Sequence, residues 1–231
     1  MAEAARRYLF VTGTDTGVGK TTVSRALLAA WRRQGLAVTP LKPIETGCGD
    51  ELLAQDATAL AAAAQVSADA TCLLRYAAPV APEAAAVGQT IDTAALVAAC
   101  QAVAGQRVLV EGAGGLLVPI APGFTMADLA AQLGATVLIV ARTRLGTLNH
   151  TLLTIAECRR RSLPIAGVIL NRVEVAQGPE ENDNVRLLRD HGKVPIWGPL
   201  PFLPEASLDA LGQAAATYLP LAELSRAAGF V

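Results

Sequence analysis

The sequence predicts a single α/β domain whose mostly parallel sheet is covered by helices on both faces. Short runs rich in valine, isoleucine and leucine recur along the chain, and longer segments with helical spacing of apolar residues separate them. Strands that are apolar along their whole length are typical of parallel sheets buried on both faces. Apolar residues make up 52% of the 231 residues and charged residues 17%, which excludes intrinsic disorder and allows a sizeable core.

Six strands are predicted from these apolar runs. They span 8–11, 38–41, 108–110, 136–141, 165–170 and 194–197. Ligands of open parallel sheets bind at the carboxyl ends of the strands. Polar or chain-turning residues follow all six runs, namely Thr12-Gly13, Lys42-Pro43, Glu111-Gly112, Arg142, Asn171-Arg172 and 199–201. We therefore expect the functional residues along this edge.

Three helices are predicted from spacing and end signals. The apolar face of the first comprises Val23, Leu27, Leu28 and Trp31. A second spans 145–161 and closes with three arginines, which suit a helix C-terminus, and Asp92 caps a third over 93–104. The stretch 71–90, rich in alanine and proline, is expected to be a long loop with short turns.

Charge and cysteine usage exclude several classes of protein. A net charge of −1 argues against a basic surface for nucleic acid, and no apolar run approaches the roughly 18 residues of a membrane span. No secretory leader is visible before the first strand, so we expect a cytoplasmic protein. The four cysteines are far apart, without a CxxC pair, which excludes a zinc finger and predicts free, reduced thiols.

A phosphate-binding loop follows the first strand. Residues 13–22 read GTDTGVGKTT and lead into the first helix, which is the strand–loop–helix context of a P-loop. Lys20 is expected to reach the β- and γ-phosphates and the Thr21 hydroxyl to bind Mg²⁺. The strict pattern has its first glycine where Thr14 stands, so this is a variant loop in a P-loop NTPase-like fold.

Two acids are candidate partners of Thr21 at the metal. Glu111 ends an apolar strand, where a carboxylate suits Mg²⁺; a solvent-facing strand-end glutamate is the alternative. Asp56 shares a helical stripe with Leu52 and Leu60, where a carboxylate needs a partner or a metal unless it is solvated at the stripe's edge. The chain has only three lysines against sixteen arginines, and two of them, Lys20 and Lys42, stand at strand ends. These observations together predict Mg-ATP as a ligand.

Five segments in order along the chain resemble the dethiobiotin synthetase family. They read VTGTDTGVGKTT (11–22), LKPIETG (41–47), VEGAGGLLVPI (110–120), LGTLNH (145–150) and ILNRV (169–173). The resemblance implies an ATP-dependent ligase that converts 7,8-diaminononanoate and CO2, supplied from bicarbonate, to dethiobiotin, ADP and phosphate with Mg²⁺. It also implies a carbamate, a carbamic-phosphoric anhydride and a homodimer, without nucleic-acid or membrane partners.

Site residues follow from matching these segments to the family. Lys42 matches the active-site lysine near the carbamate, and it forms the expected catalytic set with Lys20 and Thr16. The residues expected to contact the nucleotide or its metal are Gly17, Val18, Gly19, Lys20, Thr21, Thr22, Asp56, Glu111, Gly112, Ala113, Gly114, Asn171, Arg172, Pro201, Phe202 and Leu203. The residues expected to contact the substrate are Thr16, Lys42, Thr46, Leu145, Gly146 and Asn149.

The tail-binding segment and two departures from the family complete this match. The segment that holds the substrate's carboxylate tail in the family, partly from the partner subunit, is matched by Leu145, Gly146 and Asn149. His150 is expected to orient the start of that helix rather than to catalyse. Gly17 stands where some members have glutamate and Glu83 where some have histidine, which leaves the role of the loop 79–86 open.

Three other functions are weighed against this one. A cobyrinic-acid-type amidoligase needs a glutaminase domain, for which the roughly thirty residues after the last strand are too few. Partition and septum-site switch ATPases carry an extra lysine where this chain has Asp15. A bare nucleotide-binding module leaves Lys42 unexplained.

Overall fold

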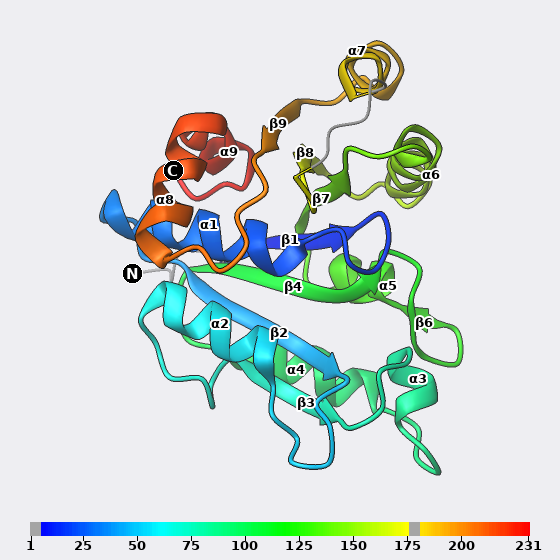
Figure 1. Cartoon of the computed structure of the whole chain (residues 1–231). Coiled ribbons are helices and arrows are strands. Elements are labelled where there is room, and N and C mark those ends of the chain that lie inside the picture. The colour runs from blue at the N-terminus through cyan, green and yellow to red at the C-terminus, as the bar shows by residue number, and fades with distance from the viewer. Residues whose placement is uncertain (1–5, 176–180) are drawn as a thin grey trace, which may run out of the picture.

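The computed structural model describes residues 6–175 and 181–231, and its centre is a seven-stranded sheet (Figure 1). The strand order is β3-β2-β4-β1-β7-β8-β9, and every neighbouring pair in this sheet is parallel. The predicted α/β fold with a parallel sheet is therefore confirmed.

The strands are longer than the apolar runs that predicted them. Their bounds are β1 (Arg7–Gly13), β2 (Thr39–Thr46), β3 (Cys72–Tyr76), β4 (Arg107–Gly115), β7 (Thr136–Arg142), β8 (Ile165–Asn171) and β9 (Ile196–Leu200). A separate antiparallel hairpin consists of β5 (Pro119–Ala121) and β6 (Phe124–Thr125). All six predicted strands are present, but Lys42 and Glu111 lie inside β2 and β4 rather than after them.

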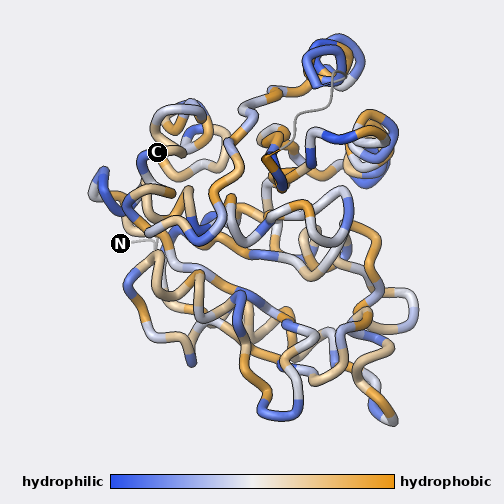
Figure 2. Tube along the Cα trace, in the orientation of Figure 1, coloured by the Kyte–Doolittle hydropathy of each residue, from blue (hydrophilic) through white to orange (hydrophobic). Residues whose placement is uncertain are grey.

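Helices cover both faces of the sheet. One face is packed by α1 (Lys20–Arg33), α2 (Gln55–Ala64), α8 (Leu208–Tyr218) and α9 (Leu221–Ala227). The other is packed by α4 (Thr93–Ala102), α5 (Met126–Gln132), α6 (Thr147–Arg160) and α7 (Glu181–Gly192). The short α3 (Pro82–Ala85) lies against the hairpin strand β5. Figure 2 shows hydrophobic strands at the centre and hydrophilic stretches on outer helices such as α7.

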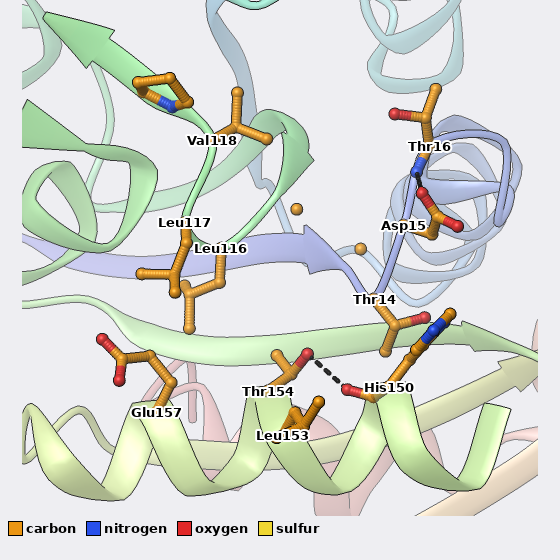
Figure 3. Close-up of a pocket in the computed structure, with 13 residues that line it drawn as sticks. Thr14, Asp15, Thr16, Leu116, Leu117, Val118, His150, Leu153, Thr154 and Glu157 are labelled. Atoms are coloured by element: carbon orange, nitrogen blue, oxygen red, sulfur yellow. Dashed lines mark hydrogen bonds between the residues drawn. The ribbon is translucent and has the colours of Figure 1, made fainter. Parts of the chain in front are cut away.

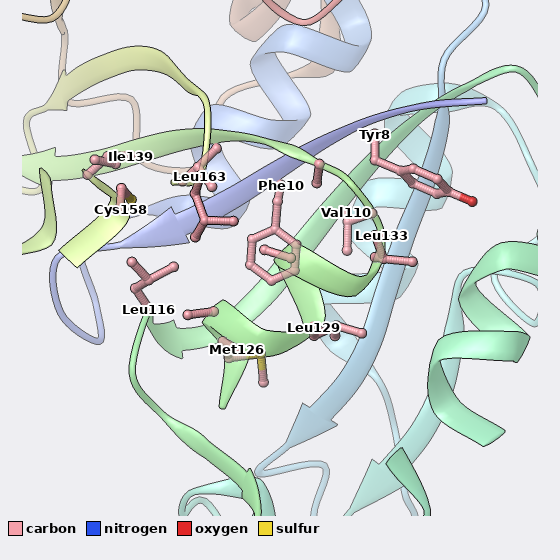
Figure 4. Packing of buried hydrophobic residues seen from close by; sticks show 14 of the residues in the cluster. Tyr8, Phe10, Val110, Leu116, Met126, Leu129, Leu133, Ile139, Cys158 and Leu163 are labelled. Atoms are coloured by element: carbon pink, nitrogen blue, oxygen red, sulfur yellow. The ribbon is translucent and has the colours of Figure 1, made fainter. Parts of the chain in front are cut away.

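Each face has its own apolar core. On the α5 side, Phe10 is fully buried and faces Met126, as Figure 4 shows. On the α1 side, the predicted apolar face of the first helix is buried, and Trp31 packs edge-on against Phe230 with ring centroids 5.4 Å apart. Burying one such aromatic side chain stabilises the fold by about 1.5–3 kcal/mol, so these layers hold the strand edges in fixed positions.

Two sequence expectations are wrong and two helices are shorter than expected, one of them being α6, which spans Thr147–Arg160 and not 145–161. The stretch 71–90 is not a long loop, because it contains the edge strand β3 and the helix α3. Leu52 is not on the helix of Asp56; it lies three residues before α2 with a φ of 50° and is 43% exposed. Asp92 does cap α4, accepting from the backbone N–H of Ala95 at 2.9 Å, and this helix ends at Ala102.

The cysteine prediction is confirmed. Cys48, Cys72, Cys100 and Cys158 are free and buried. Burial raises the pKa of the Cys100 and Cys158 thiols to about 12. In the described part of the chain, no helix combines the length and the apolarity needed to span a membrane.

Candidate functional site

The P-loop connects β1 to α1 at the carboxyl edge of the sheet. Gly19 adopts a φ of 87° immediately before α1, a left-handed conformation that favours glycine. The backbone N–H of Thr14 donates to the carbonyl of Val140 at 3.0 Å, which ties the loop to β7. Lys20 lies back over the loop, so that a Cβ added at Gly13 would lie 3.2 Å from its Nζ atom.

Four predicted site residues from different elements converge beside this loop. The ammonium of Lys42, on β2, lies 2.8 Å from Asp56 Oδ2 on α2 and 2.7 Å from Glu111 Oε1 on β4. The hydroxyl of Thr21, on α1, lies 2.9 Å from Asp56 Oδ1 and 2.9 Å from Glu111 Oε1. The structure therefore brings the expected metal-binding residues and the expected catalytic lysine to one point.

Two charges of this cluster, those of Lys42 and Glu111, are buried, whereas the side chain of Asp56 is 42% exposed. Lys42 is 3% exposed, and burial opposes its charge, but attraction to Glu111 and Asp56 outweighs burial and raises the pKa of Lys42. Burial is the largest single influence on Asp56 and would raise its pKa, but the attraction and hydrogen bond of Lys42, the hydrogen bond of Thr21 and the charge of Lys20 together lower it. For Lys20, burial and the neighbouring Lys42 lower the pKa of the ammonium. The pair Lys42–Asp56 is thus ionised before any ligand arrives.

The oxygens of this cluster fit Mg²⁺. Glu111 Oε2 is buried and has no hydrogen-bond partner, so one carboxylate oxygen remains for a ligand. Thr21 and Asp56 supply further hard oxygen atoms, which are the ligands that Mg²⁺ prefers. Among the described residues, no three His, Cys, Asp or Glu side chains gather as a metal cage, so the remaining ligands would come from phosphate and water.

Two cavities meet at Thr16. One of about 390 Å³ is lined by the P-loop together with Lys42, Thr46 and Asp56. The other, of about 620 Å³, lies between residues 13–16, the loop 115–119 and α6, as Figure 3 shows. The second cavity, called the apolar cavity below, is lined mainly by apolar surface that includes Leu117 and Leu153, although Asp15 and Glu157 also line it. The two cavities share Thr16.

Asn171 lies on the opposite side of the P-loop. Its Nδ2 donates to the carbonyl of Val18 at 3.0 Å, while its Oδ1 is buried without a hydrogen-bond partner. Gly19 approaches it so closely that an added Cβ would lie 2.1 Å from Asn171 Nδ2. Arg172 pairs with Glu181, with 2.5 Å between Nη2 and Oε1, and residues 201–203 lie half-buried after β9. The free Asn171 oxygen leaves an acceptor for a ligand at this position.

Some predicted residues lie away from these cavities. Gly112 is a packing residue, because an added Cβ would lie 2.9 Å from the Phe10 ring, whereas Ala113 and Gly114 line the pocket of Lys42. Leu145, Gly146 and Asn149, which are expected to bind the substrate's tail, are all exposed. Among the described residues, these three are not part of the lining of that pocket. His150 lines the apolar cavity, and the roles of all these residues remain predictions.

Sequence reasoning missed Glu45, which lines the pocket of Lys42. This residue is 6% exposed, and its carboxylate accepts from the backbone N–H groups of Asp56 at 2.8 Å and Ala57 at 2.9 Å. The available signal was an acidic residue three positions after Lys42, near the end of the same strand.

Comparisons with known proteins connect this geometry to a family. A model of the AAA domain matches residues 7–209. An ATP-dependent dethiobiotin synthetase from Anaeromyxobacter dehalogenans (strain 2CP-C) is 49% identical, over 78% of this chain and 82% of the relative. Another from Xanthomonas campestris pv. campestris (strain 8004) is 38% identical, over 88% of this chain and 95% of the relative.

Solved structures share the fold at low sequence identity. A cobyrinic acid a,c-diamide synthase from Mycobacterium smegmatis, with bound ADP and magnesium, has a TM-score of 0.53 and 19% identity over 92% of this chain and 94% of that one. A ParA family ATPase from Chlorobium tepidum TLS has a TM-score of 0.55 and 15% identity over 98% and 97%. These likenesses establish the fold alone. The sequence relatives extend along most of the chain, and on their identity and coverage the chain belongs to the ATP-dependent dethiobiotin synthetase family.

Proposed function

We propose that this chain is a Mg-ATP-dependent dethiobiotin synthase, a single-domain enzyme that works as a homodimer in the cytoplasm. It closes the ureido ring of dethiobiotin from 7,8-diaminononanoate and CO2 and releases ADP and phosphate. The observation that carries this proposal is the placement of a second lysine, Lys42, beside the P-loop lysine Lys20 in one pocket. Nucleotide binding alone needs only Lys20.

The reaction brings anions together, which is why two cations are needed. One amine attacks CO2 and loses a proton, giving a carbamate. A carbamate oxygen then attacks the γ-phosphorus of ATP, forming a carbamic-phosphoric anhydride and releasing ADP. The second amine attacks the carbonyl carbon, loses a proton and expels phosphate as the ring closes. Lys20 and Lys42 neutralise the carbamate and the γ-phosphate, and Thr16, which lines both cavities, hydrogen-bonds between them.

Thr21, Asp56 and Glu111 would hold Mg²⁺ on the phosphates. When bound, the ion supplies charge neutralisation at the transferring phosphoryl group. The unpaired Glu111 Oε2 supports this assignment because a buried carboxylate oxygen without a partner is costly unless a ligand satisfies it.

Asn171 would recognise the adenine base through hydrogen bonds. Its amide offers N–H donors and a carbonyl acceptor, and Nδ2 already donates to the P-loop carbonyl of Val18. The unpaired Oδ1 can accept from the exocyclic amine of adenine, while Arg172 and residues 201–203 flank the base.

The apolar cavity would receive the aliphatic part of the diamine. It adjoins the lysine pocket at Thr16, so the two amines can lie at Lys42 while the methylene chain contacts Leu117 and Leu153. The exposed residues Leu145 and Asn149 would close the far end from a second subunit and bind the substrate's carboxylate.

The test is ADP release from Mg-ATP and bicarbonate with and without 7,8-diaminononanoate, followed by mass analysis of the product. We expect diamine-dependent ADP release and a product that has gained one carbonyl and lost two hydrogens. Equal ATP turnover without the diamine would refute the substrate assignment and favour a switch ATPase.

A further inference from the structure

The helix α2 begins without a capping side chain of its own. Its N-cap residue is Ala54, which offers no side-chain oxygen to the first backbone N–H groups. Those groups are satisfied instead from β2, where the two oxygens of Glu45 accept from Asp56 N at 2.8 Å and Ala57 N at 2.9 Å. Asp56 and Ala57 are the second and third residues of α2, the positions that an N-cap side chain normally serves.

This remote cap acts on the residue that faces the metal cluster. The backbone of Asp56 is held by Glu45, and its side chain reaches Lys42 at 2.8 Å and Thr21 at 2.9 Å. Glu45 and Lys42 belong to the same strand, so β2 holds Asp56 at both its backbone and its carboxylate. A capping side chain at residue 54 would satisfy the same N–H groups, but it would move together with α2. It would therefore not hold the start of α2 against β2, as Glu45 does.

We propose that Glu45 is a positioning residue that fixes Asp56 for Mg²⁺ and for Lys42. Glu45 is 6% exposed, and its negative charge lies at the positive end of α2. Its carboxylate is therefore held in one position and does not exchange its hydrogen bonds with solvent. The inference rests on the proposed function, which assigns Asp56 to the metal. Residues that orient metal ligands typically account for 10–100-fold in metal affinity.

Binding of Mn²⁺ to the full chain with ADP, measured from the electron paramagnetic resonance of free Mn²⁺, tests this role without turnover. We expect Glu45→Ala to weaken Mn²⁺ binding about tenfold or more. Glu45→Gln keeps the shape and one acceptor oxygen, so it should fold and weaken binding by about threefold to tenfold. Glu51→Ala, which removes an exposed acid from the same connection, is the matched control and should bind Mn²⁺ as the parent does.

A second substitution separates positioning from capping. Ala54→Ser in the Glu45→Ala background gives α2 a local cap; we expect it to recover the melting temperature but not the Mn²⁺ affinity. Recovery of both, or parental Mn²⁺ affinity in Glu45→Gln, would overturn the proposal. Asp56→Ala separates the two assignments: if it too binds Mn²⁺ as the parent does, the metal site fails and the Glu45 role with it. If Asp56→Ala weakens binding and Glu45→Gln does not, only the Glu45 role fails.

Discussion

Among single residues, Lys42 bears most directly on the chemistry, because its charge is buried and already held by Asp56 and Glu111. We expect Lys42→Ala to lower kcat by about 10²–10³, the usual cost of one preorganised charge or donor, while the Kd for ATP changes little. Steady-state kinetics and ATP titration check this. Lys193→Ala, which removes an exposed lysine, should leave both unchanged. A near-normal kcat in Lys42→Ala would remove this lysine from the mechanism.

The acids of the cluster make a separate prediction about magnesium. Asp56→Ala and Glu111→Ala each delete a carboxylate from the proposed metal set, and we expect the Mg²⁺ concentration for half-maximal turnover to rise at least about tenfold. Titration of ADP release with Mg²⁺ measures this directly. Asp50→Ala, at an exposed position before α2, serves as the control. An unchanged Mg²⁺ titration in both cluster variants would contradict the assignment.

Gly112, which is predicted to contact the nucleotide, also lies close against the ring of Phe10. An added methyl group would lie 2.9 Å from the buried ring, so we expect Gly112→Ala to lower the free energy of unfolding by about 1–3 kcal/mol. The KM for ATP should stay within about twofold of the parent's value, which corresponds to well below 1 kcal/mol of binding free energy. Urea unfolding and kinetics measure the two effects. Phe10→Leu in the same chain should recover part of the stability, and a large rise in KM with normal stability would support the nucleotide role instead.

Among the strands and helices, prediction succeeded where the apolar signal was continuous and failed where structure depends on partners. The buried central strands are apolar along their length, so their positions followed from sequence. β3 was missed because it is an edge strand that pairs only with β2, and its side chains are mostly half-buried between alanine- and proline-rich neighbours. The ends of β2 and β4 were missed because Lys42 and Glu111 form an ion pair inside the sheet. No local sequence pattern shows that two charged residues far apart in the chain will pair.

The same distinction holds for the site. Thr21 follows a glycine loop, and Lys42 and Glu111 each follow an apolar run, so the sequence could place them together at one edge. Asp56 was expected to share a helical stripe with Leu52. Leu52 lies outside the helix, so that reason was wrong, but Asp56 does lie in the cluster. Glu45 was missed because its partners are backbone N–H groups, which have no residue signature.

The end of α6 carries an ion-pair cluster whose pH dependence can be predicted. Hydrogen bonds from Arg160 and Arg161 lower the pKa of Glu157 from 4.5 to about 2, and Arg161 also pairs with Asp128 on α5 at 2.7 Å. Because the folded pKa is lowered, the stabilisation is present above pH 4.5 and is lost as the pH falls toward 2. Glu157→Gln should therefore cost about 1 kcal/mol at pH 7, a value limited by solvent screening, and progressively less below pH 4.5.

Urea unfolding of the parent and Glu157→Gln chains between pH 7 and pH 3 tests this pH dependence. Glu223→Gln, an exposed glutamate on α9, is the control and should show no such convergence. A stability gap that stays constant or widens as the pH falls would contradict the prediction.

For the molecule as a whole, the residues that one chain leaves exposed are compatible with the proposed dimer. Two leucines that line the apolar cavity, Leu117 and Leu153, are 53% and 61% exposed, and Leu145 before α6 is 82% exposed. Scattered exposed leucines are ordinary, but two on one cavity, with a third just before the helix that lines it, form a surface suited to a partner. A second subunit docked there would cover the leucines and complete the apolar cavity.

The substitution Leu153→Glu tests this surface, because it places a charge where the partner would bury apolar area. We expect the variant to sediment as a monomer, since burying an unpaired charge in the interface costs several kcal/mol. The KM for the diamine should rise by about tenfold or more, because the variant loses both the partner and an apolar wall of the cavity. The Kd for ATP should be unchanged, because the nucleotide lies on the P-loop of each chain. Val66→Glu, an exposed apolar residue after α2 on the opposite face of the sheet, should remain dimeric with a parental KM. If Leu153→Glu stays dimeric, the interface lies elsewhere. If it becomes monomeric with an unchanged KM, neither a partner subunit nor the Leu153 wall of the cavity holds the substrate.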